Sequence, residues 1–207
     1  MLNKKKIPKD FYQNINVTEI AVQLLGKQLF TNINGELTGG IIVETEAYNG
    51  ITDKASHAYG GRFTDRTKTM YKEGGVSYVY LCYGIHYLFN VVTGPLNCPQ
   101  AVLIRAIEPL IGLDIMLRRR NMTTFKPAVC SGPGALSKAL GITKGLNDED
   151  LGGNEIWIEE VDCDVYSQKV LAAKRIGVDY AQEDALLPWR FYVEGNKFVS
   201  RIPKNQF

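Results

Sequence analysis

A strand-like stretch that carries two acids is the first place where this sequence could do chemistry. The segment IVETEAY, Ile42 to Tyr48, combines β-branched and aromatic residues with two glutamates. Because side chains alternate between the two faces of a strand, we expect Glu44, Glu46 and Tyr48 on one face. A carboxylate at Glu46 beside apolar and aromatic neighbours could activate a water, and an exposed face or a structural ion pair is the alternative.

A single arginine in another apolar stretch is a natural partner for that acid. In AVLIRAI, residues 101–107, Arg105 is the only charged residue. A guanidinium in an apolar strand needs an acidic partner or a bound anion, because an unpaired buried charge is unstable. We therefore expect Arg105 to meet Glu46.

One histidine and a cluster of tyrosines could handle an aromatic ligand. His57 lies in the glycine-rich segment SHAYGGR, where the alternative is a solvated or backbone-bonded loop residue. Tyr78, Tyr80, Tyr83 and Tyr87 crowd into YVYLCYGIHY. Aromatic faces stack on nucleic-acid bases, and a protruding side chain can wedge between them. The alternative is a sheet core with tyrosines at its edge.

Composition describes an ordinary globular chain. The 207 residues are 45% hydrophobic and 22% charged, and a net charge of +2 is only weak evidence for nucleic-acid binding. Cys82, Cys98, Cys130 and Cys163 form no C-x-x-C pair, so we expect buried reduced thiols and neither a metal cluster nor a disulfide framework. There is no signal-peptide pattern and no apolar run of membrane-spanning length, which predicts a cytoplasmic protein.

The elements that would position these residues are mostly strands. Asn34-Gly35 predicts a hairpin turn between QLFTNI and ELTGGIIVETEAY, and residues 76–94 predict strands with a bend at Tyr83-Gly84. Residues 101–109 predict a further strand, Pro109 predicts the start of a helix to Leu117, and residues 131–142 predict a glycine-rich turn entering a short helix. EIWIEE and RFYV predict closing strands. The pattern indicates an α+β fold with a largely antiparallel sheet, a flexible basic leader over residues 1–10 and a single domain over residues 11–207.

Taken in order, several of these segments resemble one family. The segments VETEAY, SHAYGGR, YVYLCYG, VLIRAIEP, CSGPGAL and RFYV, together with Asn90, resemble the alkyladenine (3-methyladenine) DNA glycosylase family from about residue 17 to residue 200. The resemblance implies a curved sheet, a protruding β-hairpin and surrounding helices. It also implies a monomeric DNA-repair hydrolase that needs no metal or cofactor and has no associated lyase step.

The resemblance implies a specific reaction. The enzyme would flip an alkylated or deaminated purine, such as 3-methyladenine, 7-methylguanine, hypoxanthine or ethenoadenine, out of duplex DNA and hydrolyse its N-glycosidic bond. Glu46 matches the general base, and Arg105 matches the arginine that helps to hold the water and the adjoining phosphate. Tyr48 and His57 match the residues that sandwich the flipped base.

The resemblance also assigns the rest of the pocket and the DNA contacts. Tyr80 matches a third pocket wall, Asn90 matches the asparagine that crowds the amino group of guanine, and Tyr83 matches the residue that fills the gap in the duplex. Basic residues expected at the DNA backbone are Arg62, Arg66, Lys68, Lys72 and Lys144.

Three positions depart from the family pattern, and two other functions remain open. Ile85 and His86 follow the wedge tyrosine, and Ala135 stands where relatives often have lysine, which leaves the DNA contacts there undefined. One alternative function is a non-catalytic nucleic-acid binding module. The other is a nucleoside-processing enzyme that would act on free nucleosides and gain nothing from duplex DNA.

Overall fold

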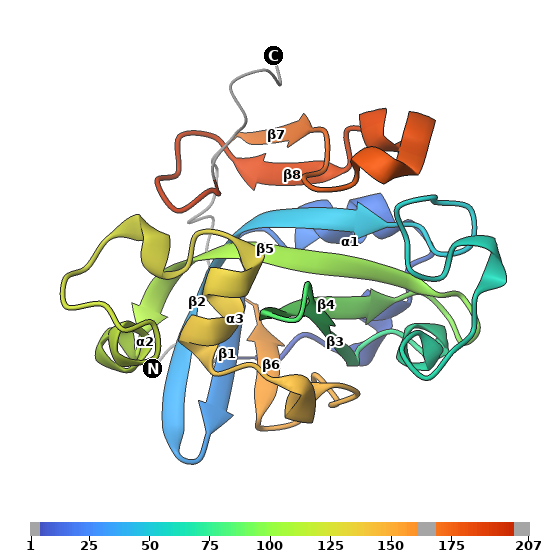
Figure 1. The fold of residues 1–207 in the computed structure, drawn as a ribbon. Coiled ribbons are helices and arrows are strands. Elements are labelled where there is room, and N and C mark those ends of the chain that lie inside the picture. Colours follow the sequence, from blue (N-terminus) through green and yellow to red (C-terminus); the bar gives the residue numbers. More distant parts are fainter. Residues whose placement is uncertain (1–4, 161–168, 201–207) are drawn as a thin grey trace.

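Eight antiparallel strands form one sheet in the computed structural model, which describes residues 5–160 and 169–200 (Figure 1). The strands are β1 (Gln28–Ile33), β2 (Glu36–Tyr48), β3 (Ser77–Cys82), β4 (His86–Thr93), β5 (Gln100–Ile111), β6 (Ile156–Glu159), β7 (Val170–Ala173) and β8 (Arg190–Val193). Their order is β3-β4-β5-β2-β1-β6, with β8 paired to β2 and β7 paired to β8. The predicted α+β class with a largely antiparallel sheet is confirmed.

Strand β2 is the spine of the sheet and the reason that the sheet curves. It pairs with β5 over most of its length, with β1 up to Ile41 and with β8 from Glu44 to Glu46. Its register with β5 shifts around Gly40 and around Glu44, and such bulges bend a strand. A Cβ at Gly40 would lie 2.4 Å from the Glu108 carbonyl oxygen, so only glycine allows this close approach.

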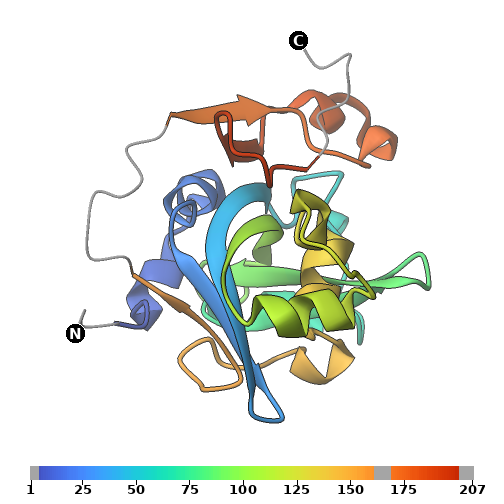
Figure 2. The same ribbon diagram turned by 90° about the vertical axis from the view of Figure 1, so that its left-hand side faces the viewer.

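Helices cover both sides of this spine. The α-helices are α1 (Val17–Gln23), α2 (Leu113–Arg119) and α3 (Pro133–Leu140). Short 3₁₀ segments are η1 (Lys9–Gln13), η2 (Tyr59–Gly61), η3 (Lys68–Tyr71), η4 (Pro127–Val129), η5 (Lys144–Leu146) and η6 (Asp179–Leu186). Figure 2 shows α1 on one side of β2, with α2 and α3 on the other. No helix in the described ranges is long and apolar enough to cross a bilayer.

The predicted helix start at Pro109 is wrong. Strand β5 continues through Pro109 to Ile111, and α2 begins only at Leu113. Proline is tolerated here because β4 pairs with β5 only as far as Leu103, so the missing N–H faces no neighbouring strand on that side. The glycine-rich turn and helix predicted over residues 131–142 are present as α3.

The described part of the expected leader contacts the domain. Lys6 forms an isolated bridge with Glu159, and the Ile7 N–H donates to the Ile158 carbonyl oxygen at 2.9 Å. Ile7 is also buried in the main core. From Lys6 onward, the chain is therefore held against β6.

Alternation along three strands separates the core from a cavity. On one face, Val79 of β3, Phe89 of β4 and Ile104 of β5 join the main core with Ile20 of α1. Their neighbours in sequence on the opposite face line a cavity: Tyr78, Tyr80, Leu88, Asn90, Leu103 and Arg105. The period of two in these strands therefore builds both the core and the site.

Candidate active site

A cavity of about 600 Å³ opens on this second face of the sheet. This volume is within the range of small-molecule sites and accommodates a purine. Besides the sheet, its wall includes the loop after β2, the first turn of α3 and residues 176–180. Most of the residues expected at the base pocket lie in this wall: Tyr48, His57, Tyr80, Asn90 and Arg105.

Glu46 lies directly behind the cavity wall, held by two hydrogen bonds and one ion pair. Its side chain is fully buried. Oε2 accepts from the Tyr48 hydroxyl at 2.9 Å and lies 3.1 Å from Nη1 of Arg105, and Oε1 accepts from the Ile176 N–H at 2.7 Å. All three donor residues line the cavity. The predicted meeting of Glu46 and Arg105 is confirmed.

Glu44 is a second partner of Arg105 that the sequence reasoning missed. Its Oε1 accepts from Nε of Arg105 at 2.8 Å, from Nε of Arg190 at 2.7 Å and from the Ser200 hydroxyl at 2.7 Å. Its Oε2 accepts from the Ser200 N–H at 2.7 Å. Burial alone would raise the pKa of Glu44, but the two arginines and Ser200 outweigh burial and lower the pKa.

The donors to Glu46 keep their protons near neutral pH. Burial, and then the nearby Glu46 carboxylate, raise the pKa of Tyr48 well above its usual value, so the tyrosine remains a hydroxyl donor. Burial would lower the pKa of Arg105, but Glu46 and Glu44 raise it overall, so the guanidinium remains a cation.

His57 is neutral and its tautomer follows from its partners. Burial, followed by the charges of Arg66 and Arg62, lowers the pKa of His57 to about 4. Nδ1 lies 2.8 Å from the Tyr78 hydroxyl, and Nε2 lies 3.3 Å from Nη2 of Arg66. Since arginine only donates, Nε2 is the acceptor and the ring proton is on Nδ1, directed at Tyr78.

Aromatic rings and one cation form a side wall of the cavity. The rings of His57 and Tyr80 meet edge to face, with centroids 4.5 Å apart and planes at 80°. The guanidinium of Arg66 lies 4.9 Å from the Tyr80 ring centroid. Arg66, which the sequence placed at the DNA backbone, therefore extends over the pocket wall. Burial raises the pKa of Tyr78 to about 12, so its hydroxyl is also uncharged.

Asn90 is a fixed polar group in the wall. Its side chain is buried, and its amide nitrogen donates to the Tyr78 carbonyl oxygen at 3.0 Å across the β3–β4 ladder. This bond holds the plane of the amide. The side chain is thus a rigid obstacle in the wall and not an adaptable contact.

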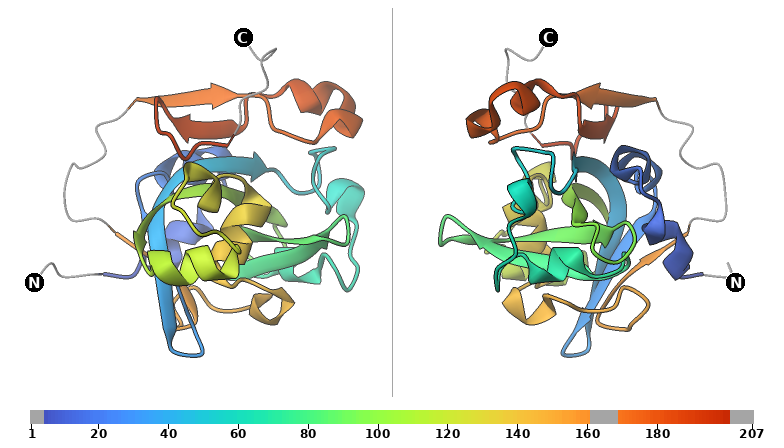
Figure 3. Two further views of the ribbon diagram at one scale, coloured as in Figure 1. Left: turned by 60° about the vertical axis from the view of Figure 1, so that its left-hand side comes forward. Right: turned by 90° about the vertical axis from the view of Figure 1, so that its right-hand side faces the viewer.

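Tyr83 is at the tip of a hairpin that projects from the body (Figure 3). Strands β3 and β4 pair as far as Cys82 and His86, and Tyr83 and Gly84 both have positive φ, as a tight turn requires. Tyr83 is 88% exposed and its neighbour Ile85 is 73% exposed. The predicted bend at Tyr83-Gly84 and the protruding hairpin are confirmed.

The two other departures from the family pattern meet at α3. A Cβ on Gly134 would lie 2.7 Å from Cγ of His86, so the His86 ring lies against the first turn of that helix. His86 and Ala135 both line the cavity.

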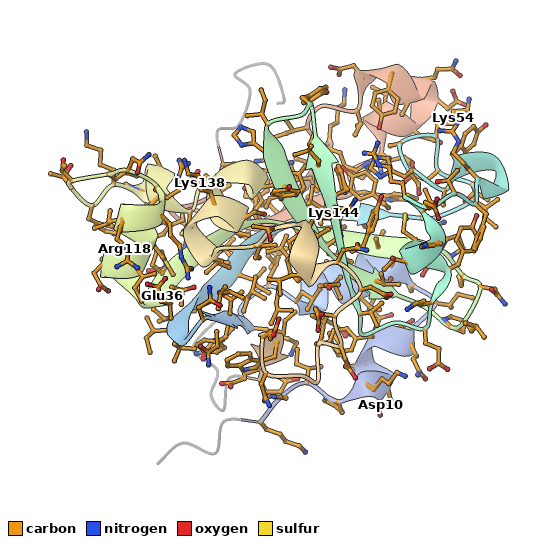
Figure 4. All side chains as sticks on the ribbon, turned by 60° about the horizontal axis from the view of Figure 1, so that its bottom comes forward. Asp10, Glu36, Lys54, Arg118, Lys138 and Lys144 are labelled. Carbon is orange, nitrogen blue, oxygen red and sulfur yellow. The ribbon has the colours of Figure 1, made fainter. Side chains whose placement is uncertain are left out.

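The remaining basic residues are exposed on segments beside β3. Lys68 pairs with Asp65 at 3.1 Å, and Lys72 pairs with Asp148 at 2.5 Å. Arg62 and Lys144 make no ion pair within the described ranges, and Lys144, at the start of η5, is labelled in Figure 4.

Some residues near the site were not predicted from the sequence, and they differ in whether the sequence marks them. Arg190 is the only charged residue in its short apolar strand, which is the same signal that revealed Arg105. Ile176 gave no signal, because it acts through its backbone N–H. Asp53 and Arg175 form a buried ion pair between two loops that only the folded chain brings together.

The cysteines are less buried than expected, and the described ranges contain no cluster of metal ligands. Cys130 is buried, whereas Cys82 and Cys98 are partly exposed, which differs from the expectation that the thiols would all be buried. Cys163 lies outside the described residues. Within the described ranges, no group of three or more His, Cys, Asp or Glu side chains is placed to hold a metal ion.

Comparisons with known proteins agree with the geometry. The family model described as "Methylpurine-DNA glycosylase (MPG)" matches residues 10–197. Proteins bearing the name "Putative 3-methyladenine DNA glycosylase" are 44% identical in Desulfitobacterium hafniense (strain Y51), over 95% of this chain and 98% of the relative, and 46% identical in Bacillus cereus (strain AH820), over 94% and 98%. The relative of that name in Chlamydia felis (strain Fe/C-56) is 46% identical over 92% of this chain and 97% of its own length. The chain belongs to the methylpurine-DNA glycosylase family.

Proposed function

We propose that this protein excises alkylated or deaminated purines from duplex DNA by hydrolysing their N-glycosidic bond. The observation that carries the proposal is the Glu46 carboxylate, held by three cavity-lining residues, Tyr48, Arg105 and Ile176, behind a purine-sized aromatic pocket. Family membership supports DNA as the substrate. The proposed substrates are 3-methyladenine, 7-methylguanine, hypoxanthine and ethenoadenine.

We propose that Glu46 accepts one catalytic water. A carboxylate has about four acceptor positions; the Tyr48 hydroxyl uses one on Oε2, beside the Arg105 ion pair, and the Ile176 N–H uses one on Oε1. A water that donates to the remaining position on Oε1 would be the nucleophile, and Glu46 would be its general base. Its oxygen bonds to C1′ while the C1′–N bond breaks, its proton passes to Glu46, and the bonding electron pair leaves with the base.

The surrounding charges suit this reaction. The transition state resembles an oxocarbenium ion, which a nearby carboxylate stabilises. Arg105 is fixed between Glu44 and Glu46, and it would orient the Glu46 carboxylate and the attacking water. A cationic purine such as 3-methyladenine leaves as a neutral base, so its departure needs no acid catalyst. Among the described residues, no lysine lines the cavity, and the proposed enzyme is a monofunctional hydrolase without a lyase step.

The target nucleotide must leave the duplex to reach this cavity. We assign Tyr83, exposed at the hairpin tip, to the gap that the flipped nucleotide leaves, with the exposed Ile85 beside it. The flipped base would lie between Tyr48 and His57 against Tyr80. Aromatic faces attract a cationic base, which favours alkylated purines.

Basic residues near the hairpin would hold the phosphates. Arg62 and Lys144 are exposed without carboxylate partners in the described ranges, whereas Lys68 and Lys72 would exchange Asp65 and Asp148 for phosphate. The guanidinium of Arg66 lies over the Tyr80 ring in the pocket wall, so Arg66 would contribute both to phosphate binding and to the base pocket. Binding through such contacts weakens as salt rises. We propose that the protein acts as a cytoplasmic monomer.

Single-turnover cleavage tests this function directly. A labelled duplex with one hypoxanthine or ethenoadenine, and in parallel a methylated duplex, is incubated with enzyme and treated with alkali before electrophoresis. Wild type should give strand breaks, and Glu46→Gln should lower the rate roughly 10²–10⁴-fold, the usual contribution of a general base. Glu36→Gln, at the far end of the molecule from the loop that carries Lys54, is the matched control (Figure 4).

Three outcomes would overturn parts of the proposal. Normal excision by Glu46→Gln would remove the general-base role. Binding without cleavage of any lesion would favour a nucleic-acid binding module. Cleavage of free nucleosides with no gain from duplex DNA would favour a nucleoside-processing enzyme.

A further inference from the structure

A buried ion pair behind the cavity has no role in the chemistry described so far. Nη1 and Nη2 of Arg175 lie 2.5 Å and 2.8 Å from Oδ2 and Oδ1 of Asp53, and both side chains are completely buried. Such a paired geometry fixes the plane of the guanidinium. Arg175 also donates to the carbonyl oxygens of Ala47 at 2.8 Å and Asp184 at 3.1 Å.

Asp53 is equally tied to its own loop. Its Oδ2 accepts from the Asn49 N–H at 3.1 Å, and its Oδ1 accepts from the Ala55 N–H at 2.9 Å. The carboxylate therefore joins the loop that follows β2 to the segment that follows β7. These two segments are more than a hundred residues apart in sequence, yet both line the cavity.

Arg175 lies next to both groups that donate hydrogen bonds to Glu46. Its guanidinium lies 4.8 Å from the ring centroid of Tyr48, whose hydroxyl donates to Glu46. The next residue in the chain, Ile176, donates its N–H to the other carboxylate oxygen at 2.7 Å. Strand β7 ends at Ala173 and Gly177 has a positive φ of 77°, so no strand pairing holds Ile176 in place.

We propose that the Asp53–Arg175 pair is a positioning device that holds the Ile176 N–H and the Tyr48 hydroxyl against the Glu46 carboxylate. The role of Glu46 as a base rests on the proposed function, but the positioning itself is a property of the free protein. Both residues act through others and neither reaches the cavity wall.

An arginine suits this task better than an apolar residue or a lysine. A buried ion pair is weak evidence for stability, because desolvation offsets the attraction. The planar guanidinium of Arg175 instead fixes the direction of its hydrogen bonds. It donates to the Asp53 carboxylate and to two backbone carbonyl groups at once. A lysine would keep the charge beside Tyr48 but lose that geometry.

Activity measurements separate positioning from general stability. In single-turnover assays, Asp53→Asn and Arg175→Lys should slow the chemical step roughly 10–100-fold, as small misplacements of catalytic groups do. The duplex concentration at half saturation should change less than about threefold. The pH–rate profile should also change, because the Ile176 N–H would no longer be held against Glu46.

Matched controls come from the opposite end of the molecule. Glu36 pairs with Arg119, which also donates to the Ala139 carbonyl oxygen, so Glu36→Gln and Arg119→Lys repeat the same changes far from the cavity. Figure 4 shows Glu36 beside Arg118 at this distant end. These controls should leave the pH–rate profile in place. The proposal would be overturned if the rate loss in Asp53→Asn and Arg175→Lys were proportional to the loss of folded protein and the pH–rate profile were unchanged.

A measurement on the free protein does not depend on excision. The amide proton of Ile176, followed by ¹⁵N-resolved NMR during acid titration, should respond to protonation of Glu46 in the wild type. That response should vanish in Glu46→Gln, Asp53→Asn and Arg175→Lys and persist in Arg119→Lys. An unchanged Ile176 response in both ion-pair variants would overturn the positioning role. A wild type that shows this response but cleaves no lesion would sink the proposed function and leave the positioning role standing.

Discussion

Glu44 and Glu46 are two carboxylates on one strand, two residues apart, and both are bound to Arg105. Both are fully buried. Glu44 accepts four hydrogen bonds, from Arg105, from Arg190 and from the hydroxyl and N–H of Ser200. Glu46 accepts two hydrogen bonds, from Tyr48 and Ile176, and forms an ion pair with Arg105, and all three residues line the cavity.

The difference between the two acids lies in their donors and not in their residue type. The partners of Glu44 come from β5, β8 and Ser200, and they join the sheet to the chain beyond β8. The partners of Glu46 face a cavity where a ligand can meet them. The four hydrogen bonds of the first carboxylate fit a structural anchor. The second carboxylate accepts fewer hydrogen bonds and lies beside the cavity, which supports the role in proton transfer that we propose for it.

The largest expected effect is on stability and comes from Glu44→Gln. Removing this charge leaves Arg105 and Arg190 without their shared carboxylate, and breaking a buried pair lowers the free energy of unfolding by about 3–5 kcal/mol. Denaturant unfolding of Glu44→Gln and Glu46→Gln measures this. At temperatures where both variants are folded, Glu44→Gln should retain far more excision activity than Glu46→Gln.

The pH dependence of unfolding is a second test of the Glu44→Gln variant. Because the pKa of Glu44 is lowered from 4.5 in the folded state, its contribution to stability is complete above pH 4.5 and is lost as the pH falls through the lower folded value. The Glu44→Gln variant lacks this contribution, so its stability should fall less steeply below pH 4.5 than that of the wild type. Equal acid sensitivity, or equal loss of excision in the two glutamine variants, would break the distinction between the two acids.

A smaller effect is expected at Asn90, a rigid group in the same cavity wall. We predict that Asn90→Ser accepts guanine-type bases better, because the shorter side chain removes the obstacle to an exocyclic amino group. A change of roughly tenfold in the ratio of 7-methylguanine to hypoxanthine excision is the scale expected for one altered contact. Single-turnover rates on matched duplexes measure it, and Thr93→Ser, further along β4, is the control. An unchanged ratio would show that Asn90 does not select.

Much of this contrast was predictable from the sequence, and the remainder required the fold. The alternation in IVETEAY correctly placed both glutamates on one face, and the single charge in AVLIRAI correctly identified the partner of Glu46. No periodicity indicated that Glu44 would bind Arg190 and Ser200, since these residues are about 150 residues away in sequence. Ile176 acts through its backbone, and Pro109 extends a strand only because no neighbouring strand needs its N–H. Long-range pairing decided each of these points.

The smallest expected effect is on the pKa of His57, to which burial contributes more than the neighbouring cations do. Burial is the main cause that lowers the pKa of His57 to about 4, followed by Arg66 and then Arg62. Arg66→Met should therefore raise this pKa by less than one unit above its value of about 4 and leave it well below 6.5. Arg62→Met should raise it less.

NMR titration of the His57 ring measures both shifts, and their order tests how the cavity is charged. Neutral His57 favours the folded state fully above pH 6.5, and this contribution declines as the pH falls from 6.5 towards 4. Arg66→Met should reduce that decline, because the folded and unfolded pKa values move closer together. A larger shift in Arg62→Met than in Arg66→Met would mean that the Arg66 side chain does not stay over Tyr80 in solution. The cavity would then differ from the surroundings of Glu44 in the mobility of its charges as well as in the partners of its carboxylate.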